Sequence, residues 1–461
     1  MEFNKIINEN KDLIVKTLQE LLQIKSILDE STATKEMPFG KGINDALDYM
    51  MNLAHKDGFE TSRDGGYAGE ITYGDGDEIV GILCHLDVVP EGSNWTYPPY
   101  EARIVDGKIY ARGTTDDKGP TIASYYALKF IKDANIKLKK KIKIILGTDE
   151  ETGWRGISHY LSKYPMPNTG FAPDCSFPLV YGEKGRFALD LKVANPNSCA
   201  VNSDALISLK GGERYNVVID EAEAVAKLDL TREFSKYLEE NHLEGDVVTE
   251  GNNYKYTLKG VSAHAMEPEK GINAGTHLCN FFKDYTSNEL VKYLAKYHHL
   301  DYNLNKLGLD YTDYEMGPAT CNIGIIDISP ESTRATLDIR YPMRFKDESF
   351  EASYKEIASN AGLEVTHFTW KRPHYVSPSD DLVKLLHNAY VKHTGDTINQ
   401  PFTVGGGTYA SVLKKAVAYG MGFPGEPELA HQRDEHLSID SLIKGVLIYI
   451  DAIIAIGELD A

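Results

Sequence analysis

The pattern of apolar residues predicts buried strands in the N-terminal part of the chain. Residues 79–84 form one apolar run rich in β-branched side chains, and residues 141–148 form a second such run. Runs that are apolar on both faces are typical of parallel strands buried between helices. Strand and helix patterns alternate as far as residue 180. We therefore expect a parallel or mixed sheet with helices on both faces.

The N-terminal residues show a helical pattern instead. Their apolar side chains recur three and four positions apart, which predicts an amphipathic helix. The apolar side would comprise Ile7, Leu13, Ile14, Leu18, Leu21 and Leu22. We expect neither a signal peptide nor a transmembrane span in this segment.

The pattern changes after Gly185. Residues 187–193 and 335–340 alternate polar and apolar positions, as half-buried strands do, and helical patterns lie between them. A capped helix is expected to begin near residues 377–381, and residues 403–405 and 416–420 again predict core strands. With 461 residues the chain exceeds what one hydrophobic core usually serves. These features predict two domains, one of them an α+β insertion.

Turn chemistry adds one local prediction. Asp106-Gly107 lies between the short runs Ile104-Val105 and Lys108-Ile109. Two-residue hairpins prefer Asp-Gly because both central positions need positive φ. We expect an antiparallel hairpin at this point, ahead of the loop that contains Asp116.

Acidic and histidine side chains follow the predicted strands. His85 and Asp87 leave the first apolar run on one side, and the pair Glu150-Glu151 follows the second. Another carboxylate pair stands at Asp116-Asp117. Any one of these could be a helix cap or a solvated loop charge. Adjacent carboxylates repel unless a cation or proton lies between them, so their joint occurrence favours a two-metal hydrolase site.

The ordered motifs closely resemble the co-catalytic metallopeptidases of the aminoacylase/carboxypeptidase clan, family M20. Within that family the likeness is greatest to the PepV-type dipeptidases of Gram-positive bacteria. The resemblance covers most of the chain. It is carried by residues 85–92, 95, 98–100, 106–120, 148–151, 182–185, 263–265, 338–342, 405–410 and 423–425.

The resemblance implies a catalytic domain interrupted by a lid. The expected catalytic metal-binding domain comprises residues 1–185 and 376–461, and the expected lid comprises residues 186–375. The resulting fold class is α/β, with a mixed, mostly parallel sheet covered by helices in the catalytic domain and an α+β lid.

The resemblance also implies the metal ligands. Asp116 would bridge two divalent ions, His85 and Asp174 would complete one site, and Glu151 and His431 would complete the other. His436 competes with His431 for the last position. We rank it lower because the motif places Gln and an acidic pair after the ligand.

Three further residues are expected to take part in the chemistry. Glu150 would act as the general base outside the metal sites, taking a proton from the bridging water and delivering it to the leaving nitrogen. Asp87 is spaced to orient the His85 ring. His264, in the segment 260–265, matches the histidine that stabilises the oxyanion in the family.

Substrate contacts are expected from the lid and from a glycine-rich segment. Arg340 can form a bidentate pair with a free carboxylate, although a fixed pair with Asp338 is the alternative. Asn216 matches a lid asparagine near the substrate. Gly406 and Thr408 are the expected contacts in the glycine-rich segment. The sequence departs from the family pattern at Ile219, where proline is common, and at Ser411, where arginine often stands.

Charge and cysteine content indicate which binding partners and which compartment to expect. With 49 basic and 68 acidic residues the formal charge is −19, which argues against nucleic acids and anionic membranes. The cysteines show no metal-ligand spacing, so free thiols in a reducing, cytoplasmic compartment are expected. They are Cys84, Cys175, Cys199, Cys279 and Cys321.

The sequence thus predicts a metal-dependent dipeptidase that hydrolyses short peptides with a free C-terminal carboxylate. Two divalent ions per chain are expected, most readily Zn²⁺, with Mn²⁺ or Co²⁺ as alternatives. A related N-acyl amino acid deacylase, such as an aminoacylase or a succinyl-diaminopimelate desuccinylase, is the competing interpretation, and a non-catalytic metal-binding member is a third. Because the lid is long enough to supply His264 within one chain, we expect a working monomer.

Overall fold

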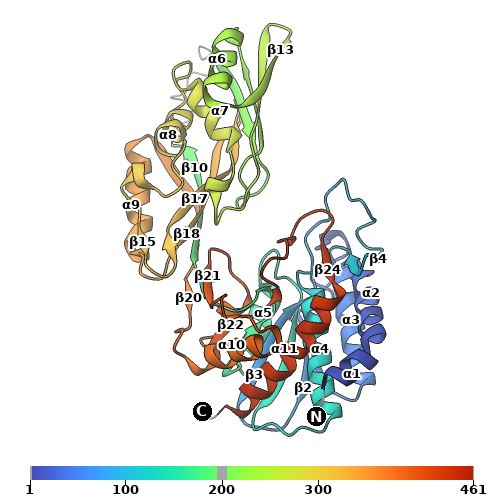
Figure 1. Cartoon of the computed structure of the whole chain (residues 1–461). Helices are drawn as coiled ribbons and strands as arrows, with labels where there is room; N and C mark the ends of the chain where they lie inside the picture. The colour runs from blue at the N-terminus through green and yellow to red at the C-terminus, as the bar shows by residue number, and fades with distance from the viewer. Residues whose placement is uncertain (1–2, 195–204, 460–461) are drawn as a thin grey trace. The chain divides into compact units, whose positions relative to one another are not determined.

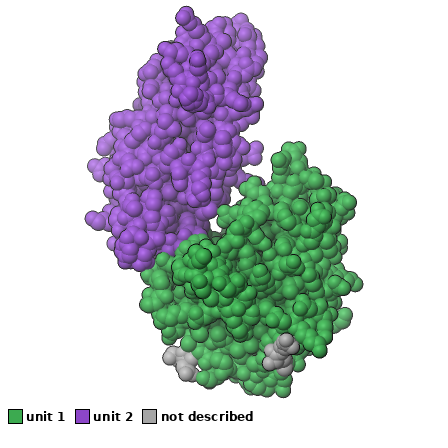
Figure 2. All heavy atoms as spheres, in the orientation of Figure 1, with its two compact units in different colours: residues 1–182, 375–402, 407–461 green, residues 183–374, 403–406 purple. Residues whose placement is uncertain are grey.

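The computed structural model describes residues 3–194 and 205–459 and divides them into two compact units. Unit 1 comprises residues 1–182, 375–402 and 407–461, and unit 2 comprises residues 183–374 and 403–406 (Figure 2). Among the described residues, no helix combines the length and the apolar character needed to cross a bilayer.

Unit 1 is built on a mixed sheet (Figure 1). Its central strands run parallel, and the strands at either side are antiparallel to them. In spatial order the strands are β1 (Glu60–Asp64), β2 (Ala68–Tyr73), β6 (Lys141–Gly147), β3 (Ile79–His85), β7 (Thr169–Ala172), β22 (Ala416–Ala418), β9 (Val180–Glu183) and β20 (His374–Tyr375), and β21 (Phe402–Val404) pairs with β9. All residues of β3 are buried, as the apolar run predicts.

Helices cover both faces of this sheet. The main core joins the sheet to α1 (Phe3–Glu9), α2 (Lys11–Leu22), α3 (Lys41–Lys56), α4 (Lys118–Asp133), α10 (Asp381–Thr394) and α11 (Ile439–Glu458). On the other face, Tyr160 of α5 (Arg155–Lys163) donates to the carboxylate of Glu70. Both oxygens of this carboxylate also accept from Lys143 Nζ, each at 2.9 Å. The predicted α/β class is confirmed.

The N-terminal segment departs from the single helix that its pattern predicts. Asn10 separates α1 from α2, and its side chain donates to the carbonyl of Ile6. Within α2, Leu13 lies about 100° from Ile14 and about 140° from Leu18 around the helix axis. It therefore points away from the buried face and is 49% exposed, while Ile14 and Leu18 are fully buried. The predicted burial of Leu13 is wrong.

Other local predictions are confirmed. β4 (Arg103–Val105) and β5 (Lys108–Tyr110) form an antiparallel hairpin closed by Asp106 and Gly107, both at positive φ. Asp380 caps α10 by accepting from the N–H of Leu382. β5 also pairs with β24 (His436–Ser438), which precedes α11. The described cysteines are free thiols, and Cys199 lies outside the described residues.

Unit 2 consists of an antiparallel sheet with helices on one face. Its strands, in spatial order, are β13 (Glu244–Glu250), β14 (Asn253–Lys259), β12 (Glu221–Ala226), β11 (Leu206–Gly211), β17 (Thr320–Ile328), β18 (Thr333–Tyr341), β10 (Gly185–Val193) and β19 (Leu363–Lys371). The helices that cover the core face are α6 (Thr231–Asn241), α7 (Ala274–Phe282), α8 (Glu289–Tyr297) and α9 (Asp347–Asn360).

Side chains alternate in direction along the central strands of unit 2, which gives the sheet an apolar core face and a polar face. Leu337 and Ile339 on β18, and Phe187 and Leu189 on β10, enter the core. The residues between them, which include Asp338, project from the opposite face because side chains alternate along a strand. That face carries the polar residues discussed below.

Candidate metal centre and its surroundings

Three neighbouring parallel strands deliver acidic and histidine side chains to one edge of the unit 1 sheet. His85 is the last residue of β3, Glu151 follows β6, and Asp174 follows β7. Because β6, β3 and β7 are adjacent and parallel, their carboxyl ends meet. The sheet topology therefore places these three side chains together.

Two loops complete the cluster. Asp116 lies just before α4, and His431 lies in the loop that precedes β24. The pairing of β24 with β5 brings these loops side by side, and the N–H of Ala111 donates to the carbonyl of Glu435 at 3.1 Å. Sequence positions more than 300 residues apart thus meet at one site.

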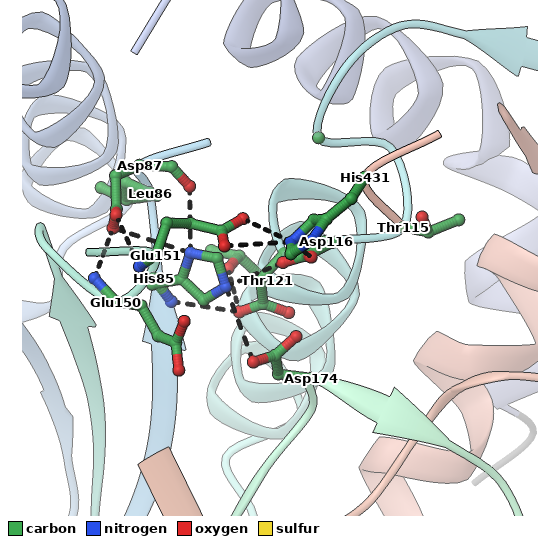
Figure 3. A network of polar contacts seen from close by, with 12 residues as sticks. His85, Leu86, Asp87, Thr115, Asp116, Thr121, Glu150, Glu151, Asp174 and His431 are labelled. Carbon is green, nitrogen blue, oxygen red and sulfur yellow. Dashed lines mark hydrogen bonds and ion pairs between the residues drawn. The ribbon is translucent and has the colours of Figure 1, made fainter. Parts of the chain in front are cut away.

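The five side chains form two groups that share Asp116 (Figure 3). In the first, His85 Nε2 lies 3.0 Å from Asp116 Oδ1 and 3.6 Å from Asp174 Oδ2. In the second, His431 Nε2 lies 3.0 Å from Asp116 Oδ2 and 3.0 Å from Glu151 Oε2. Within each group the potential ligand atoms all lie within 4.8 Å of one another. Among the described residues, these are the groups that can hold a metal ion.

The buried atoms of the cluster suit a cation. His85 Nε2 is buried and makes no hydrogen bond, although two carboxylate oxygens lie near it. Burial raises the pKa of Asp174 to about 6 and that of Glu151 to about 7. The pKa of His431 rises to about 11, because its bonds to Asp116 and Glu151 outweigh the effect of burial. The raised carboxyl pKa values also reflect crowded negative charge, which a bound cation would balance.

Asp87 and Glu150 support the cluster from the side. Asp87 lies beside the Nδ1 atom of the His85 ring, with its backbone carbonyl 3.0 Å from Nδ1 and its carboxylate Oδ1 3.7 Å from it. The carboxylate also accepts from the N–H groups of Glu150 and Glu151, each at 3.1 Å. Glu150 belongs to neither group of potential ligands, and burial raises its pKa well above the usual value.

Several supporting residues are not evident from the sequence. Asp117 accepts from the N–H of His85 at 3.1 Å, a role that the acidic pair Asp116-Asp117 does not reveal by itself. Glu435 is fully buried and binds Arg112 Nη1 at 2.7 Å. Lys118 is also buried and donates to the carbonyl of Ile24 at 2.7 Å. Only their closeness to the metal motifs could have singled them out.

The predicted lid residues lie in unit 2. The N–H of Ala265 donates to the carbonyl of Asn216 at 2.9 Å, and Val217 forms a β-bridge with His264, so the loops of Asn216 and His264 are joined. Asn322 Nδ2 clamps the Asn216 loop to the polar face of the sheet by donating to the carbonyls on either side of it. His264 Nδ1 accepts from the N–H of Met266 at 3.1 Å.

The remaining predicted contacts are largely engaged within the protein. Arg340 is 7% exposed and donates from Nε to Asp338 Oδ1 at 2.6 Å and from Nη1 to the carbonyl of Gly405 at 3.0 Å. Gly406 belongs to the short segment 403–406 of unit 2. Thr408 is buried, and its hydroxyl accepts from the N–H of Ala410 at 3.1 Å, which caps the turn at Tyr409–Val412.

A mixed α/β sheet that presents two adjacent histidine and carboxylate groups at the carboxyl ends of its strands defines the class of metal-dependent hydrolases. Comparison with known proteins gives the family. Residues 81–455 match the family described as peptidase family M20/M25/M40, and the chain belongs to that family. The resemblance inferred from the motifs is confirmed, and the chain is a metallopeptidase.

Relatives match the chain over its full length. It is 38% identical to the putative dipeptidase YtjP of Bacillus subtilis, covering 98% of this chain and 99% of the relative. It is also 38% identical to the putative dipeptidase SH1171 of Staphylococcus haemolyticus, with 97% of each chain covered. The solved structure of human carnosine dipeptidase 1 is similar in fold, with a TM-score of 0.60, 14% identity, and 99% and 98% coverage of this chain and of that chain.

Proposed function

We propose that this metallopeptidase is a dipeptidase with two divalent ions per chain, one in each group that shares Asp116. The shared carboxylate is the observation that carries the proposal, because it would hold two ions close enough to act on one water molecule. Zn²⁺ fits the histidine and carboxylate ligands, and Mn²⁺ and Co²⁺ are the alternatives. When bound, the ions would lower the pKa of a bridging water and polarise the peptide carbonyl.

Glu150 is the proposed general base. Asp87 fixes its backbone N–H, and its side chain is left out of both ligand groups. A carboxylate beside a metal pair, but not bound to it, can take a proton from the attacking water and deliver it to the leaving nitrogen. Asp87 then has a second role, because the same carboxylate holds the N–H of Glu151.

His264 is the proposed donor to the oxyanion. Its Nδ1 accepts a hydrogen bond from Met266, so in the neutral ring the proton is on Nε2. A neutral imidazole with a proton on Nε2 can donate to the oxygen of the tetrahedral intermediate. This role requires that unit 2 act as the lid and present His264 to substrate at the metal centre of unit 1.

The names of the relatives and of one structural neighbour support a small peptide substrate. The full-length relatives are named putative dipeptidases, and one structural neighbour is named carnosine dipeptidase 1. We propose a peptide with a free C-terminal carboxylate that binds on the polar face of unit 2, in the region of Arg340 and Asn216, with contacts from Gly406 and Thr408. A cytoplasmic monomer without nucleic-acid or membrane partners completes the proposal.

A substrate screen tests the reaction class. The zinc-loaded enzyme is incubated with dipeptides, N-acetyl amino acids and N-succinyl amino acids, and the products are separated by liquid chromatography. Cleavage of dipeptides is expected. Hydrolysis of the N-acyl amino acids alone would identify a deacylase instead, and no hydrolysis of any substrate would indicate a non-catalytic member.

A mixing experiment tests whether one chain supplies the whole site. We expect His264→Ala and Glu150→Gln to be inactive separately, with metal content unchanged. A mixture of the two proteins should stay inactive if His264 acts within its own chain. Recovery of activity in the mixture would show that His264 acts across a subunit interface, and the monomer proposal would be wrong.

A further inference from the structure

Two arginines of unit 2 share one buried carboxylate. Arg186 on β10 lies directly opposite Arg340 on β18 in the antiparallel ladder. Arg186 Nε donates to Asp338 Oδ2 at 2.7 Å, and Arg340 donates to Asp338 through Nε at 2.6 Å and Nη2 at 3.3 Å. The Asp338 side chain is completely buried. Since one carboxylate faces two guanidinium groups, the cluster keeps a net positive charge.

The neighbouring strands do not add a second carboxylate at this level of the sheet. Lys371 on β19 lies opposite Arg186, so cationic residues occupy equivalent positions on three adjacent strands. On the fourth strand, β17, Thr320 lies opposite Arg340. Asn322 lies opposite Asp338, and its amide is engaged with backbone carbonyls. Directly opposite residues of an antiparallel ladder share a face, so the positive charge collects on the polar face of the sheet.

The two arginines differ in how many of their guanidinium nitrogens are already hydrogen-bonded. Arg340 is 7% exposed and uses Nε, Nη1 and Nη2 on Asp338 and the carbonyl of Gly405. The side chain of Arg186 is 38% exposed, and within the described residues only its Nε has a hydrogen-bond partner. The Nη1–Nη2 edge of Arg186 therefore remains for an acceptor that is not part of the described chain.

We propose that Arg186 binds the free carboxylate of the substrate, with Arg340 and Asp338 holding its guanidinium in place. Two parallel N–H groups match the two oxygens of a carboxylate and form a strong bidentate pair. The same face of unit 2 carries the Asn216 and His264 loops, which are clamped to it through Asn322. This inference rests on the proposed function, because it names the residue that recognises one end of the proposed substrate.

Binding measurements on a variant that does not turn over test the inference. Zinc-loaded Glu150→Gln protein is titrated calorimetrically with a dipeptide and with the same dipeptide carrying a C-terminal amide. The dipeptide is expected to bind more tightly than its amide. Adding Arg186→Gln should weaken dipeptide binding about 10- to 100-fold, the range for loss of charge-assisted hydrogen bonds. Binding of the amide should change by less than about threefold, as expected if only the carboxylate contact is lost.

A matched arginine provides the control. Arg344 has a 35% exposed side chain and donates to Asp313 Oδ2 at 2.7 Å, and Asp313 is completely buried, so the pair resembles Arg186 and Asp338. Arg344→Gln should leave the preference for the carboxylate unchanged. Arg186→Lys keeps the charge but loses the planar fork, so it should restore part of the preference.

Two results would overturn the inference. One is an unchanged preference for the carboxylate in Arg186→Gln, which would leave Arg340 as the anchor. The other is an equal loss in Arg344→Gln, which would show that any broken arginine pair disturbs unit 2. Failure of the proposed function would be seen separately, as absence of dipeptide hydrolysis by the wild-type enzyme, and the binding preference can be measured in either case.

Discussion

Replacing Glu435 by Gln should weaken both the fold of unit 1 and its affinity for metal. Glu435 Oε2 accepts from Arg112 Nη1 at 2.7 Å and from the N–H of Gly113 at 3.0 Å. Oε1 accepts from the N–H of Thr115 at 2.8 Å and from its hydroxyl at 2.9 Å. One buried side chain therefore joins the loop of His431 to the loop that leads into Asp116.

The size of the effect follows from what the substitution leaves behind. Arg112 is 2% exposed, so its charge would lose its buried partner, and breaking such a pair costs about 3 to 5 kcal/mol. The amide NH₂ of Gln would also face N–H donors where a carboxylate oxygen now accepts. Changes in the residues that support metal ligands typically lower metal affinity about 10- to 100-fold. We therefore expect Glu435→Gln to lower the free energy of unfolding by about 3 to 5 kcal/mol and the metal affinity by about 10- to 100-fold.

Glu70→Gln is the matched control, because Glu70 also forms a buried ion pair in unit 1, with Lys143, away from the metal loops. Urea unfolding would be followed by the fluorescence of Trp95 and Trp154, with Trp370 replaced by Phe so that the signal reports unit 1. Metal affinity would be measured by competition with a chromophoric chelator. The reasoning is refuted if Glu435→Gln and Glu70→Gln lower stability alike but neither changes metal affinity.

Three further predictions concern the site and unit 2. Glu150→Gln should keep its metal but lose about 100-fold or more in turnover, and near wild-type activity at full loading would contradict its role. Asp116→Ala should lose metal from both groups, measured by elemental analysis after gel filtration. Burial lowers the pKa of His277 and His298 to about 4 and that of His299 to about 3, whereas the unfolded chain titrates near 6.5. The unfolded state therefore binds more protons below pH 6.5, and unit 2 should lose up to about 1.4 kcal/mol per histidine for each pH unit from there toward pH 4. Unfolding curves from pH 7.5 to 5 that show no such loss would contradict this.

Local patterns were sufficient for the elements whose residues carry their own signal. The continuous apolar run of β3 and the Asp106-Gly107 turn need no distant partner to be recognised. The N-terminal prediction failed on two points. The apolar spacing continues on both sides of Asn10, so it does not reveal that the helix is broken there. Leu13 lies about 140° from Leu18 around the axis of α2, so it does not belong to the apolar side.

The meeting of the candidate metal ligands depends on pairing that no local pattern encodes. His85 and Glu151 follow recognisable strands. Asp174 reaches them because β7 pairs with β3, and His431 because β24 pairs with a hairpin strand that precedes it by more than 300 residues. From residues alone Asp174 and His431 look like ordinary loop side chains, and only the family motifs singled them out.

The polar face of unit 2 shows how register decides chemistry. Within β18, Asp338 and Arg340 stand two positions apart, which suggests a self-contained ion pair. The ladder with β10 adds Arg186, 152 residues away in sequence, and turns the pair into a cluster with a net positive charge and an open guanidinium edge. β10 contributes none of the candidate metal ligands. If Arg186 reads the substrate's carboxylate, a change at this position alters substrate preference while the metal centre stays intact, so specificity and catalysis can vary independently in this fold.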